Sequence, residues 1–173
     1  GWTDYLLRQA AQSGLLEAIY QEEPPAILDF VDARTEATEI TPNREQMEII
    51  DDIGSTLADG FKVHLIHGVT GSGKTLVYCH LARQALEQGR TVLVLTPEIA
   101  LTGAILAYFR GFFGDQVTVI HSAMNDQERL ASWLGTRQGK YRIVVGPRSA
   151  VFAPLEDIGL VIVDEEHDSS YKQ

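Results

Sequence analysis

A glycine-rich run of eight residues constrains the fold of this chain more than any other feature. It fits the pattern G-x-x-x-x-G-K-[ST] at every fixed position and reads Gly68-Val69-Thr70-Gly71-Ser72-Gly73-Lys74-Thr75. The preceding stretch, 62–67, is apolar and predicts a buried strand, and residues 76–87 predict a helix. A strand, such a loop and a helix together form a cradle for phosphate groups.

The residue types in this run suit a nucleotide phosphate. Glycine takes backbone angles closed to other residues, and successive N–H groups at the start of a helix form an anion nest. Lys74 is expected to bring its charge to the β- and γ-phosphates, and the Thr75 hydroxyl to reach Mg²⁺. The run therefore predicts a P-loop NTPase, in which the loop binds the phosphates of a nucleotide together with Mg²⁺. A glycine-rich turn with a chance lysine is the alternative, and the flanking strand and helix argue against it.

The remainder of the chain alternates between strand and helix patterns. A helix is predicted from Thr41 as N-cap and Pro42 as first residue to a stop at Asp59-Gly60. An alternation of this kind predicts an α/β fold with a mostly parallel sheet between layers of helices, and ligands at the carboxyl ends of its strands. The expected strands are 91–95, 117–120, 141–145 and 160–163, and the expected later helices are 100–113 and 125–137, the last with a capping box at its start.

The first forty residues differ from the rest. Residues 2–20 predict an amphipathic helix, and 21–40 an acidic connector. The helix either docks on the main domain, which we favour, or belongs to a neighbouring part of a longer protein. Residues 1–59 hold 13 acidic and 3 basic side chains, which accounts for the whole net charge of −10. We therefore expect a helical, acidic extension over 1–40 and one nucleotide-binding domain over 41–173. The acidic excess argues against nonspecific nucleic-acid binding by the extension, but not by the neutral domain.

Cellular context is constrained by a few further features. A first residue of Gly rather than Met indicates an excised or processed piece of a longer protein. No run is apolar enough to cross a bilayer, so we expect no membrane partner. The single cysteine, Cys79, excludes an internal disulfide and a multi-cysteine zinc site within this chain, and agrees with a reducing cytoplasm.

A second motif lies about ninety residues after the first. The apolar run 161–163 ends in Asp164-Glu165-Glu166-His167. Asp164 is expected to hold Mg²⁺, usually through water, and Glu165 to orient and deprotonate the attacking water. His167 is expected to sense hydrolysis, and Glu166 has no separate role. An acidic helix start after a strand is the alternative, which the complete P-loop disfavours.

This second motif is a variant of the DEAH box of superfamily 2 helicases, and other stretches fall in the matching order. The whole set resembles the bacterial replication-restart, or primosomal, DNA helicases. The resemblance covers about 41–173 and is most distinctive in the closing run DEEHDSSYKQ. The other stretches are residues 96–102, His121-Ser122 and 148–152.

This resemblance implies a RecA-like first motor lobe that hydrolyses ATP and moves 3′ to 5′ on single-stranded DNA. Forked DNA and other primosome proteins are its expected partners, in the bacterial cytoplasm. Gln46 corresponds to the adenine-sensing glutamine of the family, and Tyr171 begins an aromatic-rich loop that senses DNA by stacking. The other expected DNA contacts are Thr96, Pro97, Thr102, His121, Ser122 and Arg148.

Departures and missing parts qualify the resemblance. Leu76, Ala100 and Pro147 stand where the family usually has Glu, Gly and Thr. The family's second lobe, its zinc module and the arginines that complete the ATP site are expected outside this chain. We therefore expect the chain alone to bind Mg-ATP and to hydrolyse it very slowly. The alternatives are another superfamily 2 translocase or repair helicase, and a nucleotide-dependent switch or scaffold module.

Overall fold

Residues 41–172 of the computed structural model are described here, apart from positions 70 and 98 and the side chains of 99–102. The predicted helix at 2–20, the acidic connector and Thr70 thus lie outside the described residues, as does the side chain of Thr102. The helices are α2 (Arg44–Gly54), α3 (Lys74–Glu87), α4 (Ile99–Phe113) and α5 (Asp126–Arg137). The strands are β1 (Thr91–Leu95), β2 (Val117–Val119), β3 (Ile143–Gly146) and β4 (Ile158–Val163). Short 3₁₀ helices are η1 (Gly114–Gln116), η2 (Arg148–Phe152) and η3 (Ser169–Lys172).

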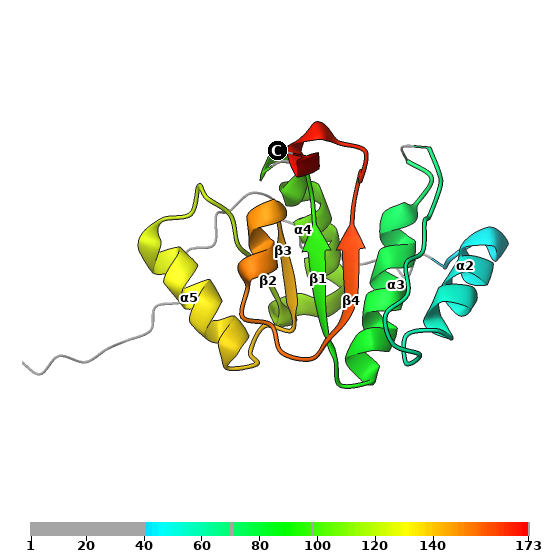
Figure 1. The fold of residues 1–173 in the computed structure, drawn as a ribbon, viewed down its shortest axis with the longest axis horizontal. Coiled ribbons are helices and arrows are strands. Elements are labelled where there is room, and N and C mark those ends of the chain that lie inside the picture. Colours follow the sequence, from blue (N-terminus) through cyan, green and yellow to red (C-terminus); the bar gives the residue numbers. More distant parts are fainter. Residues whose placement is uncertain (1–40, 70, 98, 173) are drawn as a thin grey trace, which may run out of the picture.

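One parallel sheet forms the centre of the described domain (Figure 1). Its strand order is β2-β3-β1-β4, and each neighbouring pair runs parallel. Leu95 pairs with Gly146 of β3 and with Val163 of β4, so these strands end at one level. The α/β architecture with a parallel sheet is therefore confirmed, and the carboxyl ends of the strands share one edge.

The main core lies between one face of the sheet and helices α3 and α4. Alternate residues of the strands, such as Val92 and Val94, pack there against Phe109 of α4 and Cys79 of α3, all fully buried. Burying a side chain of this size contributes about 1.5–3 kcal/mol each. The core therefore fixes α3, which carries the second half of the P-loop, against the strands.

The opposite face of the sheet carries shorter elements. Leu93, Leu95 and Val144 pack there against Ala150 of η2, with Tyr171 at the margin. Helix α5 contacts this face over β2, where Thr118 Oγ1 lies 3.0 Å from Ser132 Oγ. Its predicted capping box is confirmed, because Asn125 and Glu128 exchange hydrogen bonds of 2.8 and 3.0 Å.

The predicted strand at 62–67 is wrong. These residues have neither strand nor helix structure, and the side chains of Val63 and Leu65 are 80% and 76% exposed. Ile66 packs against the buried side chains of α2 and α3. A strand needs a neighbour for its backbone groups, and in the described sheet β4 pairs with β1 alone. The apolar run therefore lies against α2 and α3 through Ile66 and does not join the sheet.

The predicted start of the first described helix is also wrong, by two residues. Asn43, and not Thr41, is the N-cap of α2. The Asn43 side chain accepts from the Gln46 N–H at 2.9 Å, and the Gln46 side chain accepts from the Asn43 N–H at 2.9 Å. Two reciprocal bonds satisfy more of the free helix-end donors than a threonine cap alone. The helix also ends early, at Gly54, and turns lead on to Gly60.

Candidate nucleotide-binding site

The P-loop is closed by glycines in conformations that other residues rarely adopt. Gly71 and Gly73 have φ angles of +79° and +82°. Gly73 is also the N-cap of α3, and no side chain caps that helix. A Cβ atom at Gly73 would lie 2.4 Å from Nε2 of Gln46. Glycine therefore lets the loop turn and leaves the first N–H groups of α3 to an anion.

Gln46 connects α2 to this loop. Besides its capping bonds, its Nε2 donates a hydrogen bond of 3.1 Å to the carbonyl oxygen of Ser72. The side chain predicted to sense adenine thus lies at the P-loop, 26 residues away in sequence. That Gln46 contacts adenine stays a prediction.

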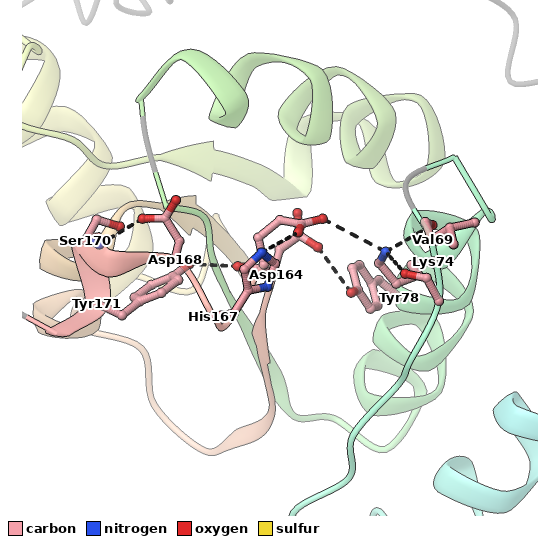
Figure 2. A network of polar contacts seen from close by, with 10 residues as sticks. Val69, Lys74, Tyr78, Asp164, His167, Asp168, Ser170 and Tyr171 are labelled. Carbon is pink, nitrogen blue, oxygen red and sulfur yellow. Dashed lines mark hydrogen bonds and ion pairs between the residues drawn. The ribbon is translucent and has the colours of Figure 1, made fainter.

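Lys74 lies across the mouth of the loop. Its Nζ donates to the carbonyl oxygens of Gly68, at 2.8 Å, and Val69, at 3.3 Å. The same Nζ lies 3.9 Å from Oε1 of Glu165 (Figure 2). The two side chains are 17% and 33% exposed, so this pair is less screened than an ion pair on the open surface. The lysine of the first motif and a carboxylate of the second therefore lie side by side.

Asp164 is held at the end of β4 by three hydrogen bonds. Its N–H donates to the Leu95 carbonyl oxygen at 2.9 Å, which extends the ladder with β1. Its Oδ1 accepts from the Tyr78 hydroxyl at 3.2 Å, and its carbonyl oxygen accepts from the Tyr171 hydroxyl at 3.1 Å. Burial raises the pKa of Asp164, while the Tyr78 hydrogen bond opposes that rise. The carboxylate is therefore oriented by a side chain of α3 and is half-buried.

Tyr78 was not among the predicted site residues. It is 6% exposed, and burial together with the charge of Asp164 raises its pKa, so the phenol keeps its proton and donates. One signal could have found it, because Tyr78 lies four residues after Lys74 and therefore on the same side of the helix. Its partner, 86 residues away, depends on the tertiary fold.

Glu165 has an unusual backbone. Its φ of +47° lies in the left-handed region, which non-glycine residues rarely occupy. Such strain is found most often at functional sites. Its carboxylate lies between the side chains of Lys74 and His167, because Oε2 is also 3.7 Å from Nε2 of His167. The site thus brings together four predicted residues, namely Lys74, Asp164, Glu165 and His167.

The residues expected to contact DNA follow the ends of the other strands. Ser122 and Arg148 are exposed, whereas Thr96, Pro97 and His121 are buried. Tyr171 is half-buried, and burial with the charges of Asp164 and Asp168 raises its pKa to about 12. Its hydroxyl is thus engaged inside the protein, and a stacking contact would use only the ring.

Two comparisons bear on the family. The family model described as the res subunit of type III restriction enzymes, ResIII, matches residues 39–173. The chain belongs to the ResIII family. This family has a RecA-like helicase domain, which agrees with the parallel sheet and the P-loop.

Many curated relatives are replication restart proteins PriA. The chain is 42% identical over 171 residues to PriA of Bacillus subtilis, which is 96% of this chain and 21% of that protein. It is 40% identical over 167 residues to PriA of Chlamydia trachomatis, covering 91% of this chain and 22% of the relative. PriA of Synechocystis is 50% identical over 114 residues, covering 66% and 14%. The resemblance to replication-restart helicases is therefore confirmed, and the chain spans about 21–22% of the first two relatives.

Proposed function

We propose that residues 41–173 form the ATP-binding motor lobe of a DNA helicase that restarts replication. The observation that carries this proposal is the 3.9 Å approach of Lys74 Nζ to Glu165 Oε1, next to Asp164. A triphosphate bound there would contact the glycine loop on one side and both carboxylates on the other.

Each residue has a defined task in this proposal. The N–H groups of the loop and of the start of α3 bind the phosphates, and Lys74 exchanges its carbonyl partners for phosphate oxygens. Glu165 takes a proton from the attacking water. Gln46 contacts the adenine, and His167, 3.7 Å from Glu165, transmits the change in charge that follows hydrolysis.

Magnesium fits the oxygen donors at this site. Among the residues that the structure describes, which leave out Glu98, no group of three or more His, Cys, Asp or Glu side chains could hold a metal. Mg²⁺ does not need such a group, because it commonly takes one or two carboxylates, substrate phosphates and water. Thr75 and Asp164 would hold it, and it would neutralise charge that develops on the phosphates.

In the whole protein, we infer 3′ to 5′ movement on single-stranded and forked DNA, together with other primosome proteins. The curated relatives are named for replication restart, which supports this inference. Zinc would be bound only in a part outside this chain. No helix in the described part is long and apolar enough to cross a membrane.

Alone, this chain is inferred to bind Mg-ATP and to hydrolyse it very slowly. Arginines from a second lobe would complete the site, and an arginine finger contributes about 10³–10⁵ in rate. A second candidate function is DNA translocation without strand separation, which the restriction-enzyme description of the matching family favours. Strand displacement on forked DNA by the whole protein separates the two.

The proposal is tested by titrating a fluorescent ATP analogue with Mg²⁺ into the chain and its variants. Lys74→Ala should abolish binding, whereas Glu165→Gln should bind and, in the whole protein, stop hydrolysis. Lys62→Ala is the matched control, because Lys62 pairs with Asp59 at 2.8 Å on the surface. Equal binding by the Lys74→Ala and Lys62→Ala variants would exclude a P-loop nucleotide site.

A further inference from the structure

A cavity of about 330 Å³ opens at the ends of β2 and β3. In the strand order β2-β3-β1-β4, β2 and β4 are the two edge strands, so the cavity lies near the opposite edge of the sheet from Asp164, which follows β4. Sites for small ligands usually measure about 300–1,000 Å³, so this cavity suits a group of modest size. Its walls include His121, Ser122, Arg129, Trp133, Ser149 and Phe152.

Aromatic side chains from two elements line this cavity. Trp133 of α5 is 36% exposed, and Phe152 at the end of η2 is 83% exposed. Helix α5 turns small and polar residues inward, namely Ser132, Gly135 and Thr136, while its indole faces the cavity. In the described part of the chain no other ring packs against Phe152. The Phe152 ring is therefore available to a flat ligand, and Trp133 borders the same cavity.

Positive charge surrounds the same cavity. Arg129 lines it, and the guanidinium carbon of Arg137 lies 5.5 Å from the centre of the Trp133 ring. Arg148 is exposed at the start of η2, next to the lining residue Ser149. Arg129 also pairs with Asp126, but exposed pairs of this kind contribute at most about 1 kcal/mol and yield readily to a phosphate.

His121 forms part of the wall, and one of its ring nitrogens has no hydrogen bond among the described residues. It is 6% exposed, and its Nδ1 is buried without a hydrogen bond among the described residues. Burial lowers the pKa of His121, so the ring is neutral near pH 7. Buried polar atoms are rarely left without a hydrogen bond. A group bound in the cavity would change the environment of Nδ1 of His121, because this residue forms part of the wall.

We propose that this cavity takes one unpaired base of single-stranded DNA, stacked on Trp133 and Phe152. The neighbouring phosphates then meet Arg129 and Arg148. Stacking accepts any base, because every base has a π-face, so the contact is independent of sequence. The inference rests on the proposed function, because it adds a contact with a DNA base to the contacts with the phosphate backbone that a helicase lobe makes.

The test compares binding of a short oligothymidylate with an oligonucleotide of equal length that carries abasic sites. Trp133→Ala and Phe152→Ala should each weaken binding of oligothymidylate roughly 5- to 150-fold and leave the abasic strand unaffected. Leu134→Ala and Val151→Ala are the matched controls, because these side chains are 41% and 53% exposed and do not line the cavity.

A second readout requires no change in the cavity. The chain has two tryptophans, so Trp2→Phe leaves Trp133 as the only one. Its fluorescence should be quenched by oligothymidylate and much less by the abasic strand. Equal affinity for both strands with unquenched Trp133, or no binding of either strand, overturns the inference.

The outcomes also separate this inference from the proposed function. Tight Mg-ATP binding together with equal affinity for the two strands would contradict the base site and support the motor lobe. Base-dependent DNA binding by a chain that binds no Mg-ATP would support the base site and contradict the motor lobe.

Discussion

The Tyr78 hydroxyl donates a hydrogen bond to Oδ1 of Asp164 at 3.2 Å, which joins helix α3 to the end of β4. The P-loop leads directly into α3, and Asp164 is the carboxylate proposed to hold magnesium. This hydrogen bond therefore links the two halves of the nucleotide site directly, in addition to the packing of α3 on the sheet.

Tyr78→Phe should lower the free energy of unfolding by about 1–2 kcal/mol, because it leaves a half-buried carboxylate with one donor fewer. Urea denaturation at pH 7 measures the change. Tyr108→Phe is the control, since Tyr108 stacks on Phe112 and its hydroxyl has no hydrogen bond within the described residues. Equal stability of the two variants would show that the Tyr78–Asp164 bond contributes nothing.

Cys79 should be inert in the folded chain. It is fully buried, and burial raises its pKa to about 12 from 9.0. A thiol reagent at pH 8 should label it only on unfolding in urea, since the thiolate is the reactive form. The folded thiol keeps a proton that the unfolded one loses, so its contribution to stability falls as pH rises from about 9 towards 12. Rapid labelling without urea would contradict the packing of α3 on the sheet.

Asp157→Gly should stabilise the chain by up to about 1 kcal/mol. Asp157 is exposed and has a φ of +50°, a conformation that glycine adopts without strain. Its hydrogen bond to Thr91 uses the backbone carbonyl and survives the change. Glu165→Gly relieves a similar φ of +47° but also removes the contact with Lys74, so its gain should be smaller. Thermal unfolding compares the two variants; a larger gain for Glu165→Gly would mean that the Lys74 contact stabilises nothing.

Sequence patterns predicted the elements whose signals are local. The P-loop, the strand 91–95 and the Asn125 capping box follow from neighbouring residues, and the structure has them where expected. The strand at 62–67 failed because its apolar residues report a tendency to be buried, whereas a strand also needs a neighbour for its backbone. Asn43 replaced Thr41 as N-cap because its partner, Gln46, returns a second hydrogen bond.

The parts of the site that escaped prediction depend on contacts between distant segments. Tyr78 meets Asp164 only because α3 packs beside β4. The burial of Thr96 and His121 likewise follows from the packed ends of the strands and from no local pattern. Motifs therefore identified the residues that are proposed to act on phosphate, but not those that position them.

The most direct measurement is the effect of Mg²⁺ on ATP affinity in the Asp164→Asn variant. The unchanged chain should bind ATP more tightly with Mg²⁺ than with a chelator. Asp164→Asn should lose about tenfold or more of that gain and keep its affinity for ATP without metal. Glu166→Gln, the exposed neighbour, should behave like the unchanged chain. A full magnesium effect in Asp164→Asn would contradict the claim that the P-loop and the end of β4 hold one nucleotide together.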